Sequence, residues 1–214
     1  VIGSVASELY FFNADGTFPN PVSIYFPDGA GTTEAKDPQA IAVDDAGYLY
    51  LLERDNNRIK KLTSGGVVQD HFGATDMSGE PVAGSGPGEF DNPFDLGFYN
   101  GYLFVADNGN DRIQVLETDG TFVEEFSDPG TGSGQFPSPW EIFVDPLGNR
   151  YVTNYERVLK YDDQWNLITE LGSGSPGTGP GEFDNPAGLT VHSNGYVYVA
   201  DQNNHRVQVF RPVD

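Results

Sequence analysis

The chain repeats one plan four times, and this internal repeat constrains its fold more than any other feature. Each repeat opens at a proline that begins a short apolar run, and the four prolines lie 55, 46 and 47 residues apart, at Pro38, Pro93, Pro139 and Pro186. A turn with glycine follows, and then further runs of four to six residues rich in Val, Ile, Leu, Tyr and Phe. Runs of this kind, bounded by Gly, Asn or Asp, are typical of antiparallel strands joined by hairpins. No window keeps a 3.6-residue apolar period, so we expect little helix.

Four strands every 46 to 55 residues, in tandem, predict an all-β fold: a β-propeller of four-stranded antiparallel blades. A single blade cannot bury both faces, so neighbouring blades must cover them, which accounts for the 15 Phe and 11 Tyr in a chain without long apolar runs. We expect one domain over residues 1–214. Its parts are a partial blade at 1–37, full blades at 38–92, 93–138 and 139–185, and a blade without its outer strand at 186–214.

The two ends leave the closure of the propeller open. Residues 9–12 resemble a third strand and residues 22–26 a fourth strand, whereas the last repeat stops after its third strand at Phe210. The N-terminal fourth strand could complete the last blade and give a four-bladed ring. Alternatively, the chain is an arc of a larger propeller, or an arc completed by another subunit. An open arc would expose strand edges and an apolar blade face.

The composition excludes several classes of function. The chain has 32 acidic and 11 basic side chains and a net charge of -21, and phosphate backbones repel such a surface, so we expect no nucleic-acid partner. It has no cysteine, which excludes disulfides and thiolate metal sites. The longest apolar run, residues 48–52, is far too short to span a bilayer. The chain begins at Val1, so either a targeting segment has been removed or the numbering starts inside a longer protein, and we expect a secreted or cell-surface location.

Several segments resemble the NHL repeat. Residues 198–201, Tyr-Val-Ala-Asp, lead to residues 204–210, Asn-His-Arg-Val-Gln-Val-Phe, and residues 105–107 lead in the same way to 111–115. The linker Gly-Glu-Phe-Asp-Asn-Pro at 88–93 recurs at 134–139 and 181–186. The resemblance covers residues 38–210 and implies a propeller, commonly six-bladed, so this chain departs from the pattern in its count of blades. It also implies that an enzymatic relative would hold a catalytic metal with several histidines of the inner strands.

One arginine opens the third strand of every repeat, at Arg58, Arg112, Arg157 and Arg206. Three of them have an acid five residues upstream, at Glu53, Asp107 and Asp201, and Asn154 takes that place in the third repeat. An acid–arginine pair can tie the second strand to the third through charge-assisted hydrogen bonds. Because the arginine recurs in every blade, we predict a structural role for it rather than an anion site.

The topology places the blade-to-blade linkers and the loops between second and third strands on one face. Loops on a rigid scaffold commonly carry recognition, so we predict that this face binds the partner. Its candidate residues are Glu89, Asp91, Asp107, Asn108, Asn110, Asp111, Glu182, Asp184, Asp201 and Asn203. The glycine-rich stretches at 84–88, 130–134 and 172–181 lack the lysine of a phosphate loop and predict flexible crossovers. We expect no cofactor, although Asp107, Asn110 and Asp111 offer oxygens that could bind calcium.

These observations favour a non-enzymatic, acidic scaffold that binds a protein or an extracellular polymer through its loops, or that assembles with other subunits. The alternative is a divalent-metal-dependent lyase or lactone hydrolase of propeller type. Its candidate catalytic residues are Asp44, Asp145 and His192, which all follow inner strands. One histidine cannot build a His-rich zinc centre, and hairpin turns explain the same residues.

Overall fold

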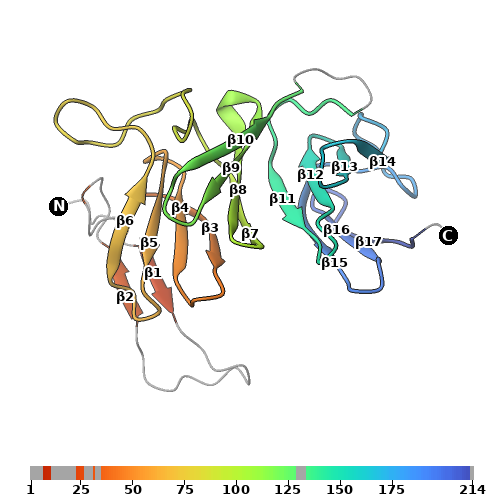
Figure 1. Ribbon diagram of the computed structural model, residues 1–214. Coiled ribbons are helices and arrows are strands. Elements are labelled where there is room, and N and C mark those ends of the chain that lie inside the picture. The colour runs from red at the N-terminus through yellow and green to blue at the C-terminus, as the bar shows by residue number, and fades with distance from the viewer. Residues whose placement is uncertain (1–6, 11–22, 27–30, 32–34, 129–133, 213–214) are drawn as a thin grey trace, which may run out of the picture.

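A computed structural model describes residues 7–10, 23–26, 31, 35–128 and 134–212, and Figure 1 shows their arrangement. The described chain is built from strands, with one short 3-10 helix, η1 (Asn108–Asn110). The all-β propeller of four-stranded antiparallel blades is confirmed. No helix in these residues is long and apolar enough to cross a membrane.

Each blade is a meander whose strands pair in the order of the sequence. The first blade contains β3 (Pro38–Val43), β4 (Leu49–Glu53), β5 (Arg58–Leu62) and β6 (Val68–Phe72). The second contains β7 (Asp95–Tyr99), β8 (Tyr102–Asp107), β9 (Arg112–Glu117) and β10 (Phe122–Phe126). The third contains β11 (Glu141–Val144), β12 (Arg150–Asn154), β13 (Arg157–Tyr161) and β14 (Leu167–Leu171). The fourth contains β15 (Pro186–Val191), β16 (Val197–Asp201) and β17 (Arg206–Phe210).

The N-terminal partial repeat forms a separate two-stranded antiparallel sheet. Its strands are β1 (Ser7–Tyr10) and β2 (Ser23–Phe26), paired from Ser7 opposite Phe26 to Tyr10 opposite Ser23. These strands agree with the third and fourth strands predicted for this region, while residues 11, 12 and 22 of that prediction lie outside the described residues.

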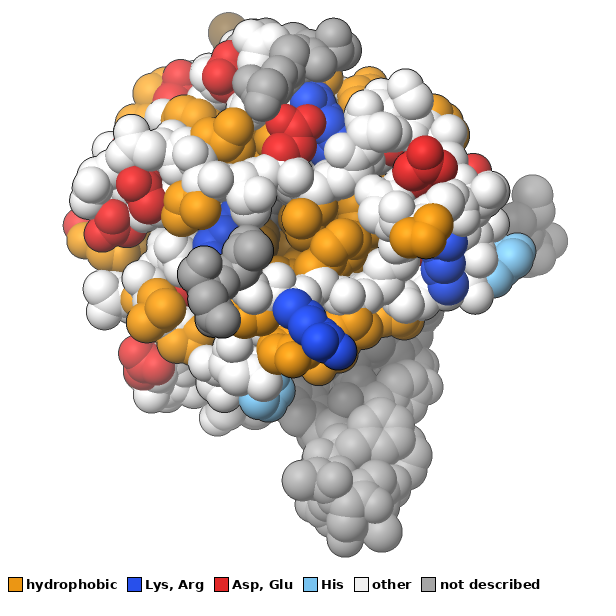
Figure 2. All heavy atoms as spheres, turned by 90° about the vertical axis from the view of Figure 1, so that its right-hand side faces the viewer, with side chains coloured by type: hydrophobic (Ala, Val, Ile, Leu, Met, Phe, Trp, Pro, Cys, Tyr) orange, Lys and Arg blue, Asp and Glu red, His pale blue; other side chains and the backbone are white. Residues whose placement is uncertain are grey.

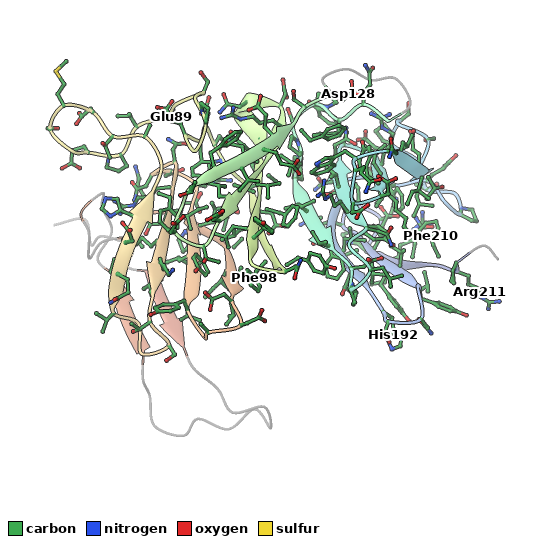
Figure 3. All side chains as sticks on the ribbon, in the orientation of Figure 1. Glu89, Phe98, Asp128, His192, Phe210 and Arg211 are labelled. Atoms are coloured by element: carbon green, nitrogen blue, oxygen red, sulfur yellow. The ribbon has the colours of Figure 1, made fainter. Side chains whose placement is uncertain are left out.

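The strand connections divide the propeller into two faces. The blade-to-blade linkers and the loops between second and third strands form one face, called here the loop face, which is uppermost in Figure 1. The turns after first and third strands form the opposite face, called here the hairpin face. Figure 3 shows Glu89 and Asp128 on the loop face and His192 on the hairpin face. The predicted sharing of one face by linkers and second-to-third-strand loops therefore follows from the observed strand order.

The hydrophobic core lies between blades rather than within them. Each inner strand packs on the next, β3 on β7, β7 on β11 and β11 on β15, and a separate cluster of buried side chains fills each of these three junctions. A fully buried phenylalanine from the preceding linker enters each cluster, at Phe90, Phe136 and Phe183. The phenylalanine that the three linkers share, in Gly-Glu-Phe or Gly-Gln-Phe, thus belongs to the hydrophobic core.

The first and fourth blades carry exposed apolar side chains on a face that the middle blades bury. In the first blade this exposure is confined to the inner strand, because Leu49, Leu51 and Leu62 of the same face are buried in a cluster with Ala35. Ile41 of β3 is 45% exposed, whereas Leu96 and Ile142, which hold the same position in the next two blades, are 4% and 3% exposed. Val207 of β17 is 62% exposed, whereas its counterpart Ile113 is fully buried. Within the described residues, β15 and β3 do not pack on each other as the other inner strands do. Among the described residues, three blade junctions are therefore packed through their inner strands, and no fourth junction of this kind joins the last blade to the first.

Candidate functional site

A recurring group of side chains, called here the linker clasp, holds each linker to the loop face. In the second blade its members are Asp107, Asn110, Arg112 and Gln114. Asp107 is fully buried and accepts hydrogen bonds from Arg112 Nε at 2.8 Å and from the amide nitrogens of Asn110 and Gln114, both at 3.0 Å. Arg112 Nη2 then donates to the linker carbonyls of Gly86 and Glu89. The carboxylate orients the arginine, and the arginine fixes the linker.

The fourth blade repeats this arrangement with Asp201, Asn204, Arg206 and Gln208. Arg206 Nε lies 2.7 Å from Asp201 Oδ2, and Arg206 Nη2 donates to the carbonyls of Gly179 and Glu182. The first blade has Glu53, Asn56 and Arg58, with the fully buried Lys60 in place of the glutamine and 2.9 Å from Glu53 Oε1. The structure thus places three of the four arginines beside the acid five residues upstream.

The third blade differs because Asn154 replaces the acid. Arg157 lies 3.2 Å from Glu170 of β14 and donates through Nη2 to the linker carbonyl of Gln135. Arg112 has the same kind of second partner in Glu125 of β10, at 2.6 Å. The outer strand therefore supplies the negative charge that the second strand lacks in this blade.

The glycine-rich linkers at 84–88 and 172–181 are held by their own hydrogen bonds, whereas residues 130–133 of the other stretch lie outside the described residues. Glu89 Oε2 accepts a hydrogen bond from Gly86 N at 2.8 Å, and a β-carbon on Gly84 would clash with the Glu89 side chain. Glu182 accepts in the same way from Gly179 N at 2.9 Å. Because glycine has no β-carbon, the backbone can pass close to the glutamate side chain and hydrogen-bond to it. These two linkers therefore have a defined conformation.

Most predicted binding-face residues lie on the loop face with their polar atoms already engaged. Asp111 Oδ1 accepts a hydrogen bond from the backbone N–H of Ser138 at 2.7 Å, and Asn108 Nδ2 donates to the Pro139 carbonyl at 3.1 Å. Both residues therefore join the second blade to the end of the linker that leads into the third blade. Asn203 Nδ2 donates to Asp184 Oδ1 at 2.9 Å. Asp91 and Asp184 each donate a backbone N–H to a clasp aspartate, Asp107 or Asp201, at 2.8 Å.

The calcium candidates fall within this network. Asp107 accepts a hydrogen bond from Asn110, whose Nδ2 also donates to the Gly84 carbonyl. Asp111 accepts from the Ser138 N–H in the linker that leads into the third blade. Among the residues that the structure describes, no group of three or more Asp, Glu or His side chains is placed to hold a metal ion.

The three candidate catalytic residues lie in separate turns of the hairpin face. Asp44 Oδ1 accepts from the backbone of Ala46 and Tyr48, and Asp145 Oδ1 accepts from the backbone of Leu147 and Asn149, all at 2.9 Å. The exposed His192 lies 2.7 Å from Asn194 through its Nδ1. Both aspartates form Asx turns and so stabilise the hairpins to which they belong. The three candidate residues do not form one cluster among the described residues.

A pocket of about 270 Å³ opens on the loop face where the four inner strands begin, and it is called here the axial pocket. One or two residues from each blade line it: Gln39, Phe94, Asp95, Trp140, Glu141 and Ala187. The rings of Phe94 and Trp140 stack with their centroids 5.3 Å apart, and Arg54 lies 5.1 Å above the Phe94 ring. Arg54 is itself paired with Asp37.

The two carboxylates of the axial pocket bridge successive blades. Asp95 Oδ2 accepts from the Ile142 N–H of the third blade at 3.0 Å, and Glu141 Oε1 accepts from the Leu189 N–H of the fourth blade at 2.9 Å. Among the residues that the structure describes, Glu141 Oε2 has neither a hydrogen-bond partner nor an ion pair, although it is buried. The buried carboxylate oxygens of Asp37 and Glu53 differ, because they face Arg54 and Lys60. One acceptor oxygen is thus left unsatisfied at the axis.

Burial changes the acidity of both carboxyl groups. Burial raises the pKa of Asp95, although the hydrogen bonds from the Ile142 and Leu96 N–H groups act against it. Burial raises the pKa of Glu141 to about 7, where the Leu189 N–H lowers it and the charge of Asp95 raises it further. Near neutral pH the pocket therefore holds a carboxyl group that can gain or lose a proton.

Sequence reasoning missed the axial pocket, although the aligned repeats carry a signal for it. Asp95 and Glu141 occupy one position of the inner strand, where the first and fourth blades have Ala40 and Gly188. A carboxylate in a short apolar strand at the axis is unusual, and two of them at matched positions are a pointer to a shared site.

A second pocket, of about 430 Å³, lies between the third and fourth blades and is mainly apolar. Tyr151, Val158 and Ile168 line it from the third blade, and Val197 and Phe210 from the fourth. Figure 2, which turns the side of the molecule that carries β17 toward the viewer, shows hydrophobic side chains within a hollow. At the junction between the second and third blades the Trp165 ring contributes to the packing and stacks on Phe126 at 4.5 Å.

A profile of the NHL repeat matches residues 183–210, from the end of the last linker to the end of β17. NHL repeat-containing protein 3 of Homo sapiens is 34% identical over 108 residues, which are 46% of this chain and 29% of that protein. The chain thus contains one segment that matches the NHL repeat and is similar over about half its length to an NHL repeat-containing protein. The Mus musculus protein of the same name is 35% identical over 117 residues, so the matches span less than a third of the length of these curated relatives.

Solved structures share the fold of this chain. Virginiamycin B lyase from Staphylococcus aureus superposes with a TM-score of 0.55 at 16% identity, over 98% of this chain and 60% of that one. A chain of the nidogen–laminin complex superposes with a TM-score of 0.56 at 16% identity, over 88% of this chain and 70% of that one. One of these proteins is an enzyme and the other comes from a protein complex, so at this identity the likeness shows the β-propeller fold alone.

Proposed function

We propose that this protein is a non-enzymatic, extracellular binding module that holds a partner protein against its loop face. The observation that carries the proposal is the fixed geometry of that face. Three clasp arginines donate to linker carbonyls in the second, third and fourth blades, at distances of 2.7 to 3.0 Å. A surface whose loops are ordered before binding loses little conformational entropy when a partner docks.

The negative net charge of the chain indicates what kind of partner surface this module would attract. The chain carries a net charge of -21, and the axial pocket at the centre of the loop face presents Asp95 and Glu141. Such a surface repels phosphate polymers and attracts basic protein surfaces, chiefly by raising the rate of association. The partner that fits best is a protein with a basic patch.

The alternative activity, a metal-dependent lyase or lactone hydrolase, has less support in the chain itself. Its candidate residues Asp44 and Asp145 accept backbone hydrogen bonds within their own turns, and His192 is exposed beside Asn194. Asp44, Asp145 and His192 would have to give up these hydrogen bonds before they could bind one metal ion together.

Selection of ligands from a random peptide library, followed by mapping of the bound face, tests the proposal. We expect selected peptides to protect linker amides, such as those of residues 84–92 and 177–185, from hydrogen exchange. Asn203→Arg, on the loop face, should weaken their binding, and Asn194→Arg, on the hairpin face, should leave it unchanged. Both positions are exposed asparagines, so the two variants change charge equally. Peptides that protect the hairpin face instead would refute the proposal.

The same preparation tests the enzymatic alternative. The protein is incubated with lactone substrates after addition of Zn²⁺, Mn²⁺ or Ca²⁺, and His192→Ala is measured beside it. Turnover that the wild type shows and His192→Ala lacks would replace the binding module with the enzyme.

A further inference from the structure

The axial pocket is a site of defined chemistry within the proposed binding face. We propose that it binds the alkylammonium group of a lysine side chain that the partner protein inserts along the propeller axis. This inference rests on the proposed function, because the loop face surrounds the pocket. It adds the chemical group that is recognised and the residues that recognise it.

The unsatisfied oxygen of Glu141 is the first reason. Glu141 Oε2 is buried beside the pocket with no hydrogen-bond partner and no cation, while Oε1 is held by the Leu189 N–H. A buried acceptor without a donor costs free energy, and a donor that enters the pocket recovers it. An ammonium group brings three N–H donors and a positive charge to such an acceptor.

The aromatic wall is the second reason. The Phe94 and Trp140 rings stack at an interplanar angle of 27° and line the same pocket as Asp95 and Glu141. Aromatic faces attract cations and shield the methylene groups of a lysine stem from water. Arg54 already lies over the Phe94 ring, which shows that a face of this ring accommodates a cation.

The charges around the pocket favour one added positive group. Asp95 and Glu141 are the acids of its lining, Gln39 and Ala187 are neutral, and Arg54 at the rim is paired with Asp37. The β15 strand, packed on β11, brings no ionisable side chain, since its sequence is Pro-Ala-Gly-Leu-Thr-Val. When both acids are ionised, the lining is therefore negative and has no cation of its own.

Entry of the ammonium group must compete with protons. The Glu141 carboxyl has a pKa of about 7, so it is mostly protonated at pH 5.5 and mostly ionised at pH 8. Binding of a cation that requires the ionised form should therefore weaken by about 30-fold between pH 8 and pH 5.5. A structural void would show no such dependence.

The chain supplies its own reporter for the experiment. It contains two tryptophans, and Trp165→Phe leaves Trp140 in the axial pocket as the single fluorophore. In this background, the peptide acetyl-Gly-Gly-Lys-Gly-Gly-amide is titrated to about 20 mM at pH 8 and pH 5.5, since one side chain alone binds in the millimolar range. The same peptide with an acetylated lysine side chain is the matched control, because it keeps the shape and loses the charge.

We expect a saturable change in Trp140 fluorescence with the lysine peptide at pH 8 and no saturable change with the acetylated one. Glu141→Gln should weaken binding at pH 8 by at least tenfold and remove its pH dependence. Asp163→Asn removes one exposed carboxylate from a turn of the hairpin face and should leave affinity unchanged. An arginine peptide that binds more tightly than the lysine peptide would overturn the assignment to an ammonium group.

The remaining outcomes separate this inference from the proposed function. Equal binding of the acetylated peptide, unchanged affinity in Glu141→Gln, or no binding of the lysine peptide at all would each overturn the ammonium site. In those cases the loop face stands if Asn203→Arg still weakens the library-selected peptides. Peptides that bind only the hairpin face would instead remove the proposed function.

Discussion

Glu141 should lower the stability of the protein as the pH rises from 5 to 8, and Glu141→Gln should remove that contribution. Glu141 ionises near its ordinary value of 4.5 in the unfolded chain, and its pKa in the folded protein is about 7. Between these values the folded state keeps a proton that the unfolded state has released. Rising pH therefore favours unfolding in this window and has no further effect above it.

The magnitude follows from the shift. A difference of one pKa unit corresponds to about 1.4 kcal/mol, so the full shift of Glu141 is worth about 3 kcal/mol. The side chain is partly exposed, and solvent screening reduces the expected effect to about 2 kcal/mol. Glutamine has no proton to lose, and its carbonyl can still accept the Leu189 N–H.

Urea unfolding of both proteins at intervals from pH 5 to pH 8 measures the effect. The free energy of unfolding of Glu141→Gln minus that of the wild type should rise by about 2 kcal/mol across this range and level off above pH 7. Taking the difference cancels the other titrating groups of this acidic chain. Glu117→Gln, which removes an exposed carboxylate from the surface, corrects for the change in net charge. A difference that stays flat with pH, or that falls, would refute a raised pKa at Glu141.

Two further substitutions test the clasp and a turn. Arg112→Met should destabilise the protein by about 3 kcal/mol in urea unfolding, because it leaves the buried carboxylate of Asp107 without its cation. Arg206→Met should destabilise it less, because the Arg206 side chain is 30% exposed. Equal losses of stability would contradict the importance of burial. Gly120→Ala should destabilise the protein more than Gly47→Ala. Both glycines have positive φ, but a β-carbon at 120 would clash with the Phe72 ring, whereas one at 47 meets open space. Equal melting temperatures of the two variants would contradict this packing argument.

The fold could be predicted from the sequence because its signals are local and repeated. Hairpin turns, strand-length apolar runs and the acid five residues before Arg112 and Arg206 all lie within one blade. The register then places Asp107 opposite Arg112 and Asp201 opposite Arg206, as a second-to-third-strand pair requires. The recurrence of these signals along the chain reduces the chance that any one is misread.

The axial pocket could not be found in the same way, because it is formed between repeats. Asp95 and Glu141 are 46 residues apart in sequence and act on the N–H groups of the following blades, so no local pattern joins them. The glycine-rich linkers were misleading for a related reason. Their composition predicts freedom, but the glycines at 84 and 86 make room for the side chain of Glu89.

Burial of the inner-strand residues in this protein depends on the neighbouring blade. Leu96, Ile142 and Leu189 lie on blades that pack against a preceding blade, and all are at most 8% exposed, whereas Ile41 has no such neighbour and is 45% exposed. The junction between blades is thus the unit that stabilises the fold, as in other repeat proteins.

The acidic composition follows from the number of turns that such a fold needs. Each hairpin leaves backbone N–H groups without a strand partner, and Asp44, Asp119, Asp145 and Asp162 all accept such groups in their own turns. The clasp aspartates and the linker glutamates work in the same way on the opposite face. Much of the charge of -21 is therefore a by-product of capping turns with carboxylates rather than a sign of one acidic site. Against that background Glu141 is distinctive, because its Oε2 is buried beside the axial pocket without a donor among the described residues, and this is the position to which we assign a ligand.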